Sequence, residues 1–220
     1  MKKLIALLAG GLLAVSVAQA DTVTFNAAKA ATTTNWTDAL SLQQFDSTLG
    51  TLTSVVFTYG GVITSIFKEE SLDAAPATIS VNTAGNLVFG LPISTTLNFS
   101  NSAMQGVSVF DGTIDFGGTS GFGPKTVVAT NSGTATFTSG VASYIGAGTY
   151  LINVAANASS NATGAGNLIS QINTTAGANI GVTYNFTKLP TTKIPEPGSM
   201  ALVGLALAGL GLVRRKTAKV

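Results

Sequence analysis

The sequence predicts an all-β fold, an antiparallel β-sandwich or jelly-roll-like domain. Apolar and polar residues alternate with a period of two over many short runs between residues 21 and 188. Gly-, Ser- and Asn-rich stretches separate these runs, and no amphipathic helix stands out among them. Such alternation indicates strands that bury one face and expose the other. About ten strands of this kind suit a sandwich or jelly roll.

Several runs define the expected strands. Residues 54–59 and 62–67 alternate on either side of Gly60-Gly61, which predicts a hairpin because two glycines can both adopt positive φ. The polar segment 157–177 predicts a surface loop. The remaining runs contain Ile79/Val81, Leu97/Phe99, Val107/Val109, Ile114/Phe116, Tyr150/Ile152/Val154 and Ile180/Val182/Tyr184/Phe186.

The first 20 residues have the three parts of a secretory signal peptide. Lys2 and Lys3 supply the basic region, residues 4–17 the apolar region, and Ala18-Gln19-Ala20 the small-x-small cleavage site. Signal peptidase is therefore expected to cleave between Ala20 and Asp21. An uncleaved N-terminal anchor is the alternative, and the short apolar region argues against it. The predicted ectodomain is then 21–188.

The C-terminal segment predicts a short membrane helix over residues 200–213. At about 1.5 Å per residue it spans roughly 21 Å, less than the ~30 Å hydrocarbon core. Arg214, Arg215 and Lys216 follow directly and are expected to hold this end on the cytoplasmic side. Residues 217–220 then form a cytoplasmic tail, and the helix is a temporary anchor.

A proline-bracketed glutamate precedes this helix, in the sequence Pro195-Glu196-Pro197-Gly198. The prolines fix φ and keep Glu196 extended, where a processing enzyme can reach it. Together with the helix and the basic cluster, these residues resemble the PEP-CTERM sorting signal of Gram-negative bacteria, here 195–216. The resemblance implies recognition by exosortase, a membrane-embedded processing enzyme. An ordinary single-pass anchor after a proline hinge is the alternative. Residues 189–194 would form a tether.

The ectodomain carries a second resemblance, to the bacterial surface domain called choice-of-anchor E. It depends on Asn35-Trp36, Gln44-Phe45-Asp46 and residues 49–52 near the start, and on residues 144–149 and 182–184 near the end. The resemblance implies a secreted all-β domain without enzymatic activity, and it supplies no catalytic residues.

The composition excludes several classes of function. The chain has no Cys and no His, which excludes Ser-His-Asp and Cys-His catalysis and His-ligated zinc. Residues 21–193 hold five Lys, no Arg and eight Asp or Glu, a net charge of −3. Nucleic-acid binding is therefore not expected. No cofactor and no enzymatic activity are expected.

Carboxylates are the remaining candidates for a site. Glu69 and Glu70 are strand neighbours, expected on opposite faces at a solvated hairpin end. Asp111 and Asp115 would share one strand face and are weak candidates for Ca²⁺ ligands, with ordinary surface charge as the alternative. Trp36 is expected to anchor the first strand, and an exposed ring that stacks on a sugar is the alternative.

These features predict an exported structural or interaction protein. The precursor is expected in the inner membrane, and the processed protein at the cell surface or in an exopolysaccharide (biofilm) matrix. The alternative is a lectin-like carbohydrate-binding module, with or without Ca²⁺.

Overall fold

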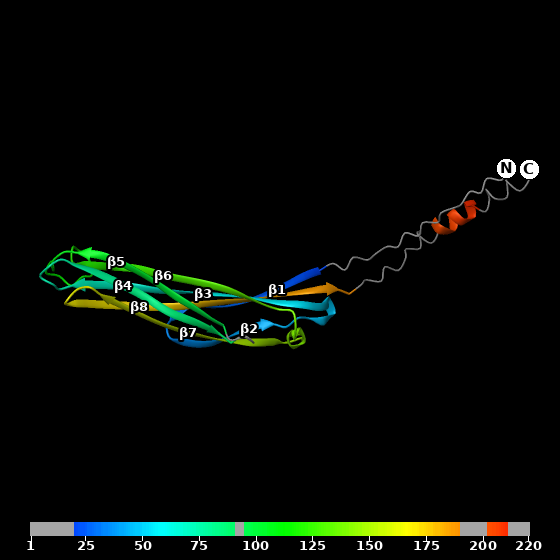
Figure 1. Ribbon diagram of the computed structural model, residues 1–220, viewed down its shortest axis with the longest axis horizontal. Helices are drawn as coiled ribbons and strands as arrows, with labels where there is room; N and C mark the ends of the chain where they lie inside the picture. The colour runs from blue at the N-terminus through cyan, green and yellow to red at the C-terminus, as the bar shows by residue number, and fades with distance from the viewer. Residues whose placement is uncertain (1–19, 91–94, 190–201, 211–220) are drawn as a thin grey trace, which may run out of the picture. The chain divides into compact units, whose positions relative to one another are not determined.

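The computed structural model describes residues 20–90, 95–189 and 202–210. Residues Gln19–Lys188 belong to one compact unit. Two four-stranded sheets build it, in the orders β1-β8-β3-β6 and β2-β7-β4-β5 (Figure 1). The strands are β1 (Ala20–Thr33), β2 (Trp36–Gln43), β3 (Gly50–Ser71), β4 (Ala77–Phe89), β5 (Thr95–Val107), β6 (Gly121–Phe137), β7 (Thr149–Thr163) and β8 (Leu168–Lys188). The predicted all-β sandwich is confirmed.

The strand pairing is that of one long hairpin rolled into two sheets. β1 pairs with β8, β2 with β7, β3 with β6 and β4 with β5, all antiparallel. Rolling adds the pair β3–β8 to one sheet and β4–β7 to the other. This order is that of an eight-stranded jelly roll, so the described residues hold eight strands and not about ten.

The hairpin predicted at Gly60-Gly61 is wrong, because both glycines lie inside β3. This strand pairs with β6 and β8 on both sides of the glycines. Apart from the glycines, the buried residues are odd-numbered from Val55 to Phe67, so the alternation of side chains continues across Gly60-Gly61. A Cβ at Gly61 would lie 2.1 Å from Leu87 Cδ1 of β4. Gly61 therefore serves close packing between the sheets.

The surface loop predicted for residues 157–177 is also wrong. β7 continues to Thr163 and β8 begins at Leu168. A Cβ on Gly164, whose φ is +117°, would lie 1.9 Å from the Thr78 carbonyl oxygen, so this turn requires glycine. The polar flanks are strands because β4 and β3 supply backbone partners along them. That pairing outweighs the poor strand propensity of Asn.

The run Ile114/Phe116 is not a strand. β5 ends at Val107, and residues 108–120, here called the β5–β6 loop, connect it to β6. Ile114 is 55% exposed and Phe116 has a φ of 60°. Both observations differ from a half-buried pleated strand.

Two hydrophobic clusters fill the space between the sheets. The larger one takes side chains from both sheets, among them Phe57, Leu87 and Tyr184. The smaller one consists of Phe67, Ile79, Val81, Val107, Phe122 and Val127. The smaller cluster lies toward the end of β3, next to the loops that hold the candidate carboxylates.

Four hydroxyl side chains lie between these clusters. Ser65 Oγ is 2.8 Å from Ser160 Oγ and 2.9 Å from Thr174 Oγ1, and Ser160 is also bonded to Thr174 and Thr83. The four residues come from β3, β7, β8 and β4, so this hydroxyl layer links the two sheets. Each hydroxyl can donate and accept, which lets the group satisfy itself away from water.

Asparagine side chains join the edge strands β5 and β6. Asn101 Nδ2 donates to the Val128 carbonyl at 2.6 Å, and Asn131 Nδ2 donates to the Asn98 carbonyl at 2.8 Å. These bonds occupy backbone groups at sheet edges that would otherwise be free to pair with another chain.

Candidate functional site

Asp111 and Asp115 lie in the β5–β6 loop, so the prediction that they share a strand face is wrong. Asp111 Oδ1 accepts hydrogen bonds from the backbone N and the hydroxyl of Thr113, each at 3.0 Å. Its Oδ2 accepts from Thr119 N at 3.3 Å. Asp115 Oδ1 accepts from Gly117 N at 2.8 Å. Both carboxylates hold turns within the loop, as aspartates commonly do.

These hydrogen bonds favour the ionised form of Asp111. The Thr113 backbone N–H contributes most and its hydroxyl next, with smaller contributions from Thr119 and Ser120. Together they hold the pKa of Asp111 below its ordinary value. Asp111 is therefore a carboxylate at neutral pH.

Glu69 and Glu70 are both fully buried, so the predicted solvated hairpin end is wrong. The Ser170 hydroxyl of β8 donates to Glu69 Oε2, and the Ser120 hydroxyl of the β5–β6 loop donates to Glu70 Oε1 at 2.6 Å. The partners come from different elements, as expected for strand neighbours on opposite faces. Glu69 Oε1 and Glu70 Oε2 have no hydrogen-bond partner among the described residues.

Burial raises the pKa of Glu69 above its ordinary value, and the Ser170 hydrogen bond opposes only part of that effect. Desolvation penalises the charged form of a carboxyl group more than the neutral form. The uncompensated oxygen at Glu69 is therefore a cost to stability when the group is ionised.

Carboxylates gather at the end of the sandwich where β3 ends and β6 begins. Asp73, two residues after β3, accepts from Gly166 N at 2.6 Å and Asn167 N at 2.8 Å in the β7–β8 turn. Its carbonyl accepts from Phe110 N of the β5–β6 loop. We call Glu69, Glu70, Asp73, Asp111 and Asp115 the acidic end. Within the described ranges, no three His, Cys, Asp or Glu side chains form a metal-binding group.

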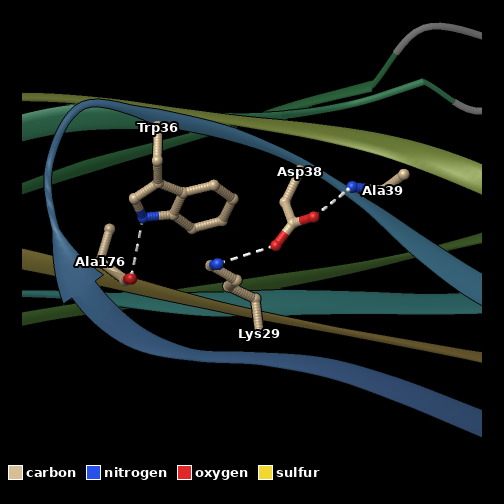
Figure 2. A network of polar contacts seen from close by, with 5 residues as sticks. All are labelled: Lys29, Trp36, Asp38, Ala39 and Ala176. Carbon is tan, nitrogen blue, oxygen red and sulfur yellow. Dashed lines mark hydrogen bonds and ion pairs between the residues drawn. The ribbon is translucent and has the colours of Figure 1, made fainter.

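Trp36 packs against the core as predicted, but it anchors β2 and not the first strand. Its Nε1 donates to the Ala176 carbonyl at 3.1 Å, and the ring packs against the larger cluster. Lys29 Nζ lies 5.6 Å from the ring centroid and 2.7 Å from Asp38 Oδ2, which orients it over the indole (Figure 2). Asp38 Oδ1 also accepts from Ala39 N. The indole ring of Trp36 therefore contacts Ala176 and Lys29 of the same chain.

An uncharged depression of about 580 Å³ lies on the outer face of the β1-β8-β3-β6 sheet. Thr58, Ser132 and Asn179 are exposed at its rim, and Gly60 lies between them. A second depression of about 280 Å³ shares Thr58 and Asn179 and reaches Asn26 of β1. The linings of both contain hydroxyls, amides and backbone, and neither contains a charged side chain.

The predicted sorting and processing residues lie largely outside the described residues. This applies to Ala18, Pro195, Glu196, Pro197, Gly198, Arg214, Arg215 and Lys216. Ala20 is described and pairs with Thr187 at the start of β1. Within the predicted membrane helix, residues 202–210 are helical, and Leu202, Leu205 and Leu207 are exposed. No helix among the described residues is long and apolar enough to cross a membrane.

Fold and tail thus define an all-β jelly roll joined to a C-terminal helical segment. Residues 193–216 match the PEP-CTERM protein-sorting motif. The chain therefore carries this motif, and the motif implies export, a membrane-anchored precursor and processing by exosortase.

The other comparisons add no relative. No curated protein matches the chain. The solved structure described as "Structure of infectious bursal disease virus Gt strain" is 11% identical over 88% of this chain and 50% of that one, with a TM-score of 0.14. The chain thus spans half the length of that protein, and a TM-score this low carries no argument about the fold.

The two serines that contact Glu69 and Glu70 of the acidic end were not predicted from the sequence. Ser120 and Ser170 lie about 50 and 100 positions from the glutamates that they contact. No local motif marks such a pair. The weak alternation in residues 108–120 is the available signal, and it indicates a loop without indicating which residues the loop contacts.

Proposed function

We propose that this chain is a structural protein without catalytic activity, displayed at the cell surface or in an exopolysaccharide matrix after exosortase processing. The sorting motif at residues 193–216 carries the proposal. The sequence lacks the His and Cys of common nucleophilic sites. Glu69 and Glu70 contact separate serines, so they do not form the facing carboxylate pair of a glycosidase.

The edge-joining asparagines and the hydroxyl layer support a structural role. They satisfy polar groups within the chain and leave a sandwich surface of low charge. A polar surface of low charge has little electrostatic attraction to charged partners in a crowded polysaccharide layer. Nothing in this role requires a cofactor.

Cell fractionation of a motif variant tests the proposal. Replacement of Pro195-Glu196-Pro197 by three alanines should leave a longer, membrane-retained species in a host with exosortase. A matched control replaces Thr191 and Thr192 by alanine, just before the motif. The proposal fails if the motif variant distributes and migrates like the wild type.

A carbohydrate-binding module is the second candidate, favoured by the uncharged depression on the β1-β8-β3-β6 sheet. Thr58, Ser132 and Asn179 can donate to and accept from the hydroxyl groups of a neutral sugar. Gly60 lets such a ligand approach the backbone. A neutral lining suits an uncharged polysaccharide better than an anionic one.

A glycan array, read with and without chelator, tests this candidate. Binding should weaken in Asn179→Ala and persist in Thr126→Ala, a control on exposed β6 outside the depression. Absence of binding to every glycan at millimolar concentration removes the candidate. Equal loss in both variants removes the assigned surface.

A further inference from the structure

Carboxylates outnumber lysines at the acidic end of the sandwich. Asp21 pairs with Lys188, and Asp38 pairs with Lys29 at 2.7 Å. Across residues 20–90, 95–189 and 202–210, no ion pair reaches the five carboxylates of the acidic end. Ala20 and Lys188, where the chain enters and leaves the sandwich, lie at the opposite end of β8 (Figure 1). Lys68 of β3 and Lys125 of β6 lie at the same end, but neither forms an ion pair with these carboxylates. Five carboxylates and two lysines leave this end with a net negative charge.

Glu70 is the buried carboxyl group that contacts the β5–β6 loop. Its side chain has no exposed surface, and only one of its two oxygens has a partner. An ionised oxygen that is buried and unpaired is strongly destabilising unless a counter-charge lies beside it. No such counter-charge is present among the described side chains.

Ser120 brings Asp111 next to Glu70. The Ser120 hydroxyl donates to Glu70 Oε1 at 2.6 Å and also accepts from Asp111 N at 3.3 Å. Thr119, its neighbour in the chain, donates to Asp111 Oδ2. Ser120 therefore links the buried Glu70 carboxylate to the backbone of Asp111, whose exposed carboxylate lies in the same loop.

We infer that Glu70 and Asp111 together bind a Ca²⁺ ion at the acidic end. Carboxylate, hydroxyl, carbonyl and water oxygens are the ligands that Ca²⁺ accepts, six to eight in flexible geometry. Mg²⁺ demands a regular octahedron, and transition metals favour nitrogen or sulfur ligands. With two carboxylates, affinity should be that of extracellular modules, a Kd of about 10⁻⁴–10⁻³ M. Glu69, which contacts Ser170, takes no part.

Thermal unfolding and calorimetric Ca²⁺ titration of the full chain in non-ionic detergent test the inference. About 10 mM Ca²⁺ should raise the Tm by roughly 3–6 °C over chelator. Glu70→Gln should abolish this rise and the binding heat, while its Tm in chelator equals or exceeds that of the wild type. An undiminished Tm in chelator would show that Glu70→Gln folds normally and has lost only a carboxylate ligand for Ca²⁺.

Glu69→Gln is the matched control, since it removes an equally buried carboxylate on the other side of the strand. It should keep the Ca²⁺-dependent rise in full. The inference is overturned if the wild type does not bind Ca²⁺, if Glu70→Gln still responds, or if Glu69→Gln loses the response equally. It is also overturned if Na⁺ at matched ionic strength gives the same rise. This test is independent of whether exosortase processes the chain.

Discussion

Leu87 of β4 occupies the space where a side chain at Gly61 of β3 would lie. A Cβ at Gly61 would be 2.1 Å from Leu87 Cδ1 and 2.6 Å from the Gly177 carbonyl oxygen. The first contact can relax by movement of a flexible side chain, but the second is with backbone of a paired strand. This position therefore fixes how closely the two sheets approach each other.

Gly61→Ala should destabilise the protein by about 1–3 kcal/mol, the cost of overpacking a core. Denaturant unfolding measures the effect. Gly106→Ala on β5 is the control, because no atom lies within 4 Å of its added Cβ. Equal stability of the two variants would show that the sheets are not packed around Gly61 as described.

Glu69 should make the protein less stable as pH rises. Its pKa is raised in the folded state, so between its unfolded and folded pKa values the folded chain binds more protons. Stability then falls as pH increases through that window, above the ordinary value of 4.5. Glu69→Gln should remove this slope and raise stability at pH 7 by about 1–3 kcal/mol.

Unfolding titrations from pH 4 to 8 check this prediction, run in chelator to exclude cation binding. Asp46→Asn is an informative contrast, since hydrogen bonds from Thr48 lower the pKa of Asp46. That substitution should change stability in the opposite sense at neutral pH. An unchanged slope in Glu69→Gln contradicts the burial assigned to this side chain.

The hydroxyl layer should contribute unequally to stability. Ser65→Ala removes two short bonds, to Ser160 and Thr174, and should cost about 1 kcal/mol. Thr83→Val should cost less, because the Ser160–Thr83 distance is 3.5 Å. Chemical denaturation gives both values. A reversed ranking argues against a bonded layer centred on Ser65.

Trp36→Phe should cost about 1 kcal/mol, mainly because the Ala176 carbonyl loses the indole N–H. Lys29→Met serves as the comparison, since it removes the charge above the ring and keeps the alkyl stem. It should cost less, as exposed ion pairs contribute little. Urea unfolding followed by far-UV circular dichroism measures both. If Lys29→Met lowers the free energy of unfolding as much as Trp36→Phe does, the contact with Lys29 contributes as much as the hydrogen bond to Ala176.

The sequence was sufficient to predict what depends on local patterning. Alternation in residues 180–186 correctly predicted the buried face of β8, because a strand with one buried face must repeat every two residues. The same rule argues against a hairpin at Gly60-Gly61, since the buried side chains from Val55 to Phe67 all lie at odd-numbered positions. A pair of glycines favours a turn, but an unbroken period of two across the pair favours one continuous strand.

The acidic end could not be predicted, because its contacts are nonlocal. The β5–β6 loop brings Ser120 to Glu70, and no pattern near Glu70 predicts that contact. Residues 157–163 and 168–177 form strands where a loop was predicted, for a related reason. Their polar composition indicates a loop, but pairing with β3 and β4 compensates for weak strand propensity.

The central claim is that the chain is exported and its C-terminal motif processed by exosortase. Intact-mass spectrometry of the protein from a host that carries exosortase tests it most directly. We expect a polypeptide that begins at Asp21 and lacks the segment 200–220. A mature surface protein whose mass still includes Arg214, Arg215 and Lys216 would show that the C-terminal segment is not removed.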